Sequence, residues 1–120
     1  MATTTELSAR KIDTRLRVIG KALRELPEAE RRWADPTVPA DERERERLAV
    51  HYEWDDKVTR FEEIAAAYEA GVLSPAQGRQ LRELVALLGT MLPTLQRLCV
   101  RVPAAGLLYR LRGAAYSSPS

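Results

Sequence analysis

The stretch AGVLSPAQ (residues 70–77) separates two long helical patterns and decides the fold. Gly71 suits the position just beyond a helix C-terminus, because glycine adopts the left-handed conformation found there without strain. Ser74, Pro75 and Gln77 match the N-cap, N1 and N3 positions of a strong helix start. The connector between the two signals has only three or four residues. We therefore predict that the flanking helices form an antiparallel hairpin.

The helix before this stretch is predicted to begin near Pro39–Asp41 and to end at about Ala70. Acidic residues occupy its first turns, where they suit the positive end of the helix dipole. The alternating charges RERER (residues 43–47) precede its apolar stripe, so the first two turns are expected to project as a solvated extension. The stripe consists of Val50, Trp54, Val58, Phe61, Ala65 and Tyr68.

The helix after the stretch is predicted to end at Pro103, with a kink at Pro93 that Gly89 eases. Its leucine stripe should face Val58, Phe61 and Ala65 around residues 84–88. The stripe consists of Leu81, Leu84, Leu88, Met91, Leu95, Leu98 and Val102, widened by Val85, Leu87 and Leu92 to nearly half of the circumference. An arc this wide is typical of a helix buried against more than one neighbour. We predict that part of it remains open to a partner as a candidate protein interface formed by Val85, Leu88, Leu92 and Leu95.

The first helix is predicted to run from about Thr5 to Leu26. Its core positions recur at spacings of three and four and are Ile12, Leu16, Ile19, Leu23 and Leu26. Pro27 is expected to end or kink this helix, with one further turn over Glu28–Trp33. Two X-Pro pairs in the connector Ala34–Ala40 indicate a rigid link rather than a strand.

Beyond Pro103 we predict a short fourth helix over residues 104–116, with Leu107, Leu108 and Leu111 facing inward. Residues 117–120 are expected to form a disordered tail. The predicted fold is therefore all-α and a single domain over residues 1–116. It is a small bundle of three long helices plus a short C-terminal helix, with the second and third helices as an antiparallel hairpin.

The composition fits a cytoplasmic protein that does not bind membranes. Residues 1–6 lack the apolar core of a signal peptide, and the longest apolar runs are far shorter than the roughly 20 residues of a membrane span. Cys99 is the only cysteine, so no disulfide can form within the chain. Only 6% of the residues are aromatic, which favours an aliphatic core between helices.

His51 is the only histidine and lies at the edge of the stripe of the second helix. In a catalytic interpretation it would be a general base oriented by Asp55, or a metal ligand together with Asp55 and Glu62. One histidine cannot supply the two Glu-x-x-His motifs of a di-iron bundle, and no nucleophile elbow is present in the sequence. We therefore interpret His51 as a boundary residue that is hydrogen-bonded to Asp55.

The remaining reactive side chains also have structural interpretations. The pairs at residues 55–56 and 62–63 are expected to form ion pairs with basic neighbours such as Arg60. Cys99 is expected to be a small buried hydrophobe. The sequence holds no Gly-rich phosphate loop, zinc spacing or dinucleotide fingerprint. We assign no catalytic residue, no metal and no cofactor.

Charge is unevenly distributed, although the net charge is only +2. Residues 35–70 carry five basic and eleven acidic side chains, whereas residues 71–120 carry six arginines and one glutamate. Two basic ridges lie opposite the core faces of the third and first helices; they consist of Arg79, Arg82, Arg97 and Arg101, and of Arg10, Arg17, Lys21 and Arg24. Such ridges can follow a phosphate backbone. The alternative is that they are solvated faces, or partners of the carboxylates on the second helix.

These observations favour a non-catalytic helical interaction protein that self-associates or serves as a small subunit of a larger assembly. The second hypothesis is a protein that binds nucleic-acid backbone non-specifically through the two ridges. No aromatic residue lies among the arginines to stack on bases, so sequence-specific recognition has little support. An enzyme built around His51, Asp55 and Glu62 is a distant third.

Overall fold

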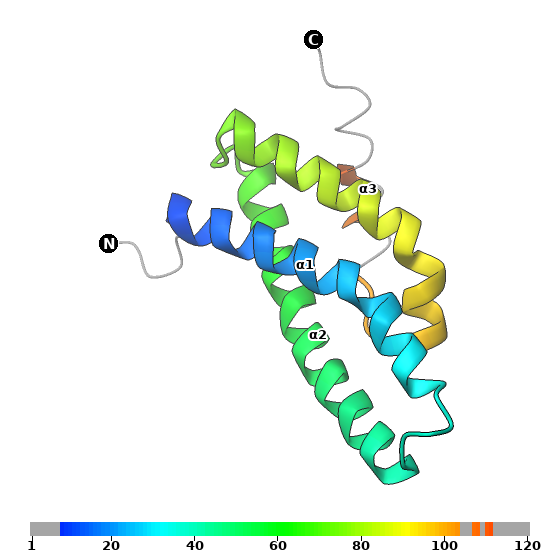
Figure 1. Cartoon of the computed structure of the whole chain (residues 1–120). Helices are drawn as coiled ribbons and strands as arrows, with labels where there is room; N and C mark the ends of the chain where they lie inside the picture. Colours follow the sequence, from blue (N-terminus) through cyan, green and yellow to red (C-terminus); the bar gives the residue numbers. More distant parts are fainter. Residues whose placement is uncertain (1–7, 104–106, 109, 112–120) are drawn as a thin grey trace.

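The computed structural model describes residues 8–103, 107, 108, 110 and 111. Within this part the chain forms three helices, α1 (Ala9–Trp33), α2 (Ala40–Glu69) and α3 (Pro75–Leu98) (Figure 1). They pack as a bundle, which confirms the predicted all-α architecture. No helix in the described residues is both long enough and apolar enough to cross a membrane.

Helix α1 begins at Ala9, where the Ser8 hydroxyl accepts a hydrogen bond from the backbone N–H of Lys11 at 3.2 Å. The expected start at Thr5 lies outside the described residues. The helix continues through Pro27 to Trp33, so the predicted end at Leu26 is wrong, whereas the further turn expected over Glu28–Trp33 is helical. Proline removes one backbone hydrogen bond, but Leu26 and Ala29 on either side of it are buried in the core. Tertiary packing keeps the last turns helical.

Helix α2 spans 30 residues and is about 45 Å long. Its first buried residue is Trp54, and Val50 packs partly buried against the core one turn earlier. The turns before Val50 are mostly exposed, in agreement with the predicted solvated extension over residues 43–47. Arg43 ties these turns to the preceding connector: its guanidinium donates to the carbonyls of Val38 at 3.0 Å and Trp33 at 3.2 Å. These bonds hold the direction in which α2 leaves α1.

The turn between α2 and α3 forms as the sequence predicts. Gly71 has φ = 76°, and the N–H of Val72 donates to the carbonyl of Ala67 at 3.0 Å, which closes the end of α2. Ser74 and Gln77 form a capping box, with each side chain bonded to the other residue's backbone N–H. The strong local signals at this turn are therefore confirmed.

Helix α3 continues through Gly89 and Pro93 but ends at Leu98, so the predicted end at Pro103 is wrong. Cys99 adopts the left-handed conformation with φ = 57°, and the N–H of Val100 donates to the carbonyl of Leu95 at 3.3 Å. Val100 and Leu95 are both buried. This is the same closing arrangement as at Gly71, stabilised here by burial instead of by glycine. Cys99 itself is exposed, which contradicts the expected buried thiol.

Helix α1 is the centre of the bundle, because it packs against both α2 and α3. The backbones of α2 and α3 contact each other much less than either contacts α1. The two helices diverge from their shared turn, and α1 crosses both (Figure 1). The two helices therefore do not pack closely along their length as expected, although Val58, Phe61 and Ala65 belong to the same buried cluster as Leu84, Val85 and Leu88. All of these α2 residues are buried.

The chain after α3 returns toward α2 and completes the core. The indole Nε1 of Trp54 donates to the carbonyl of Arg101 at 2.6 Å, and Arg110 donates to Glu69 at 2.9 Å. Leu108 and Leu111 are buried and Leu107 is half-buried, as expected for inward positions. Residues 107, 108, 110 and 111 have helical backbone, but the described residues do not delimit a fourth helix. Most of the helix predicted over 104–116, and the whole predicted tail at 117–120, lie outside them.

Candidate functional site

His51 and the carboxylates near it do not form the predicted pair. His51 is half-buried, and its Nε2 is buried without a hydrogen-bond partner in the described residues. Asp55 accepts a hydrogen bond from the guanidinium of Arg101 at 3.3 Å, and Glu62 accepts one from the same group at 2.9 Å. The predicted His51–Asp55 hydrogen bond is therefore wrong, because Arg101 binds both carboxylates. The interpretation of these carboxylates as ion-pair partners is confirmed.

The predicted ridge on the third helix is divided by ion pairs. Arg101 lies beyond the end of α3 and binds α2, as described above. Arg97 donates to Glu30 of α1 at 2.7 Å and 3.2 Å. This bidentate contact lowers the pKa of Glu30 below its ordinary value and raises that of Arg97. Two of the four arginines thus bind carboxylates of this chain.

The other six basic residues have no carboxylate partner within the described part of the chain: Arg79, Arg82, Arg10, Arg17, Lys21 and Arg24. Arg17 and Arg24 line a groove of about 610 Å³ between α1 and α3, together with Asp13 and Glu83. Positive and negative side chains therefore share this groove.

The predicted protein interface on α3 lies mostly inside the core. Val85, Leu88 and Leu95 are 0–3% exposed, and only Leu92 is half-buried. The folded chain buries most of the predicted arc, and its half-buried members are Leu87, Met91, Leu92 and Val102. In the folded chain a partner cannot reach three of these four residues.

Two apolar residues that the sequence interpretation did not single out lie on the surface of α2. Leu48 is 49% exposed and Tyr52 is 78% exposed. They are four residues apart and so lie on one face, opposite Val50 and Trp54. The sequence already contained a signal for this surface, because two large apolar residues stand four positions apart on α2 outside the stripe that enters the core. We call Leu48, Ala49 and Tyr52 the outer face of α2.

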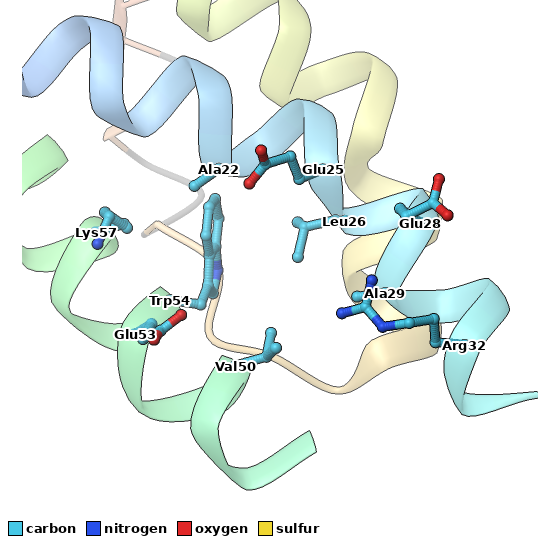
Figure 2. Close-up of a pocket in the computed structure, with 10 residues that line it drawn as sticks. All are labelled: Ala22, Glu25, Leu26, Glu28, Ala29, Arg32, Val50, Glu53, Trp54 and Lys57. Atoms are coloured by element: carbon cyan, nitrogen blue, oxygen red, sulfur yellow. The ribbon is translucent and has the colours of Figure 1, made fainter. Parts of the chain in front are cut away.

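A cleft of about 400 Å³ lies between the second half of α1 and the middle of α2 (Figure 2). We call it the α1–α2 cleft. Its apolar lining comes from Ala22, Leu26 and Ala29 of α1 and from Val50 and Trp54 of α2. Its charged lining consists of Glu25, Glu28, Arg32, Glu53 and Lys57. The opening is therefore apolar inside and charged at its rim, a combination typical of binding clefts.

No group of three or more His, Cys, Asp or Glu side chains in the described residues is placed to hold a metal ion. We found no protein-family model, curated protein or solved structure that matches this sequence.

Proposed function

We propose that the protein is a non-catalytic helical interaction protein that self-associates through the outer face of α2. The observation that carries this proposal is the exposure of Leu48 and Tyr52 on the face of α2 opposite Val50 and Trp54. Exposed apolar side chains gathered on one helical face favour contact with another protein. The α3 arc cannot take this role, since the chain itself buries most of it.

Two copies of α2 can pair antiparallel around a twofold axis near residue 50. Leu48 of each copy then lies against Tyr52 of the other, and the two Ala49 residues meet close to the axis. Such an interface is isologous, the commonest kind in homodimers. It is small, so we expect weak association with a dissociation constant on the order of 100 µM.

The contacts of Arg101 support the absence of catalysis. A histidine that acts as a general base needs a group that orients its ring. Both candidate carboxylates, Asp55 and Glu62, are bound by Arg101, and His51 makes no hydrogen bond to Asp55. This arrangement counts against the third hypothesis, an enzyme built around His51, Asp55 and Glu62.

We expect the mass of the wild-type protein in solution to rise with concentration between about 10 µM and 1 mM, as a weak small interface requires. The double variant Leu48→Ser/Tyr52→Ser should stay monomeric and keep its fold, because both side chains are exposed. Val72→Ser is the matched control, since Val72 is 62% exposed but lies at the α2–α3 turn. Sedimentation equilibrium measures all three proteins.

A cysteine pair tests the expected register. In a Cys99→Ser background, Ala49→Cys should form a disulfide-linked dimer on oxidation, whereas Ala66→Cys should not. Both alanines are exposed on the same helix. A wild-type protein that is monomeric throughout, or a Val72→Ser variant that dissociates as readily as the double variant, contradicts the proposal.

A second candidate function, binding of nucleic-acid backbone, is favoured by the six basic residues that have no carboxylate partner. Arg79→Glu/Arg82→Glu should weaken binding to duplexes of any sequence by a similar factor, because phosphate contacts do not read bases. The control Arg31→Glu/Arg45→Glu makes the same charge change away from the ridges. Fluorescence anisotropy at several salt concentrations should give a log–log slope of roughly −0.9 per phosphate contact. Absence of binding near about 50 mM salt would exclude this function.

A further inference from the structure

We propose that the α1–α2 cleft binds a basic amphipathic helix of a partner protein, in which an apolar side chain is flanked by lysine or arginine. This is a second surface: it lies on the side of α2 that faces α1, whereas the outer face of α2 points away. The proposal goes beyond self-association and can fail or hold independently of it.

The cleft has an apolar floor of limited size: Leu26, Ala29 and Trp54 are only 3–6% exposed, and the half-buried Ala22 and Val50 supply most of the apolar surface that a partner can reach. Figure 2 shows Ala22, Leu26 and Ala29 pointing from α1 toward α2, with the indole of Trp54 standing between the two helices. The Nε1 of Trp54 already donates to the carbonyl of Arg101, so the ring is held in place. A volume of about 400 Å³ accommodates one or two aliphatic side chains of a helix.

The charged side chains at the rim of the cleft favour a partner of positive charge. Three rim groups are already engaged: Glu28 binds Arg31 at 2.6 Å, Arg32 binds Glu46 at 3.1 Å, and Lys57 lies 4.0 Å from Asp56. Glu25 and Glu53 have no cationic partner among the described residues, and both are exposed.

Glu25 belongs to α1 and Glu53 to α2, so each wall of the cleft carries one available carboxylate. A partner with basic residues beside its apolar anchor would satisfy both. The groove between α1 and α3 has no such excess of unpaired carboxylates, because Arg17 and Arg24 line it together with Asp13 and Glu83. Rim charges of this kind act mainly on specificity and on the rate of association.

The test uses Trp54 as a reporter inside the cleft. The chain has two tryptophans, and Trp33→Phe leaves Trp54 as the only one, whose emission is excited selectively over that of the four tyrosines. The Trp33 Nε1 has no hydrogen-bond partner, so its removal leaves no other group unpaired. The probe is a helical peptide of about 18 residues with a leucine stripe flanked by lysines, free of tryptophan and tyrosine. A matched peptide carries glutamate at every lysine position.

We expect the lysine peptide to shift the Trp54 emission saturably, with a dissociation constant on the order of 10 µM, and the glutamate peptide to leave it unchanged. Glu25→Gln/Glu53→Gln should weaken the binding about tenfold, as the loss of two exposed ion pairs implies. Glu42→Gln/Glu83→Gln changes net charge equally at two exposed residues outside the cleft and should weaken it less than about twofold.

Equal weakening by the two double variants would overturn the proposal, since attraction would then depend on net charge alone. So would similar binding of both peptides, or binding without a change at Trp54. A changed self-association of Glu25→Gln/Glu53→Gln, with peptide binding intact, would assign the cleft to a second copy and overturn it as well. Loss of self-association in Leu48→Ser/Tyr52→Ser should not affect peptide binding.

Discussion

The variant Leu88→Asp is expected to be unfolded at room temperature. Leu88 is 1% exposed and belongs to the central core cluster on α3. Replacing it removes a buried aliphatic side chain, which costs about 2–5 kcal/mol, and leaves a carboxylate in an apolar environment, which costs several more. A domain of this size is stable by only about 5–15 kcal/mol. The two losses together approach or exceed that stability.

Circular dichroism and urea denaturation measure this effect. The matched control is Leu92→Asp, one turn along α3, where the side chain is half-buried and a carboxylate can reach water. That variant should still unfold cooperatively, with a loss of about 1–2 kcal/mol. If Leu88→Asp kept a cooperative transition similar to that of Leu92→Asp, the position of Leu88 in the core would be wrong.

The second large effect is expected for Gln77→Ala, which should lower the free energy of unfolding by about 2–3 kcal/mol. Gln77 is 6% exposed. Its Oε1 accepts from the backbone N–H of Ser74 at 3.0 Å, and its Nε2 donates to the Ala9 carbonyl at 3.1 Å and to Asp13 at 3.0 Å. One side chain therefore caps α3 and also joins its start to the start of α1.

The control for this prediction is Gln80→Ala, one turn along the same helix, where the side chain is exposed. That change should alter stability by less than about 0.5 kcal/mol. Both variants are measured by urea denaturation at one pH. A loss at Gln77 no larger than that at Gln80 would show that neither the capping bond nor the contacts with α1 stabilise the fold.

Much of this fold was predictable because its signals are local. The turn at Gly71, the capping box of Ser74 and Gln77, and the apolar stripes that enter the core all depend on residues within one or two turns of each other. Helix formation and capping are short-range effects, and the period of 3.6 residues sorts side chains onto faces without knowledge of the neighbours. The exposure of the first turns of α2, before Val50, followed from the same sorting of side chains onto faces.

The predicted C-terminal ends of the first and third helices, Leu26 and Pro103, are wrong because tertiary packing, which the local sequence does not show, decides where these helices end. Pro27 weakens a helix by itself, yet the burial of Leu26 and Ala29 keeps α1 continuous. Cys99 lacks the freedom of glycine, yet the burial of Val100 closes α3 there. In both cases tertiary burial outweighs a local preference of about 1–3 kcal/mol.

The candidate sites depended still more on the tertiary structure. A helical pattern shows that Arg97 and Arg101 point away from the leucine stripe, but it does not show that Glu30, Asp55 and Glu62 meet them there. It marks a wide apolar arc on α3, but not that the folded chain buries most of that arc. The sequence alone determined the helices, their main turn and their inward faces, since these arise from contacts between near neighbours. Only the tertiary structure decided which faces remain open, because that depends on how α1 crosses two helices that are distant from it in sequence.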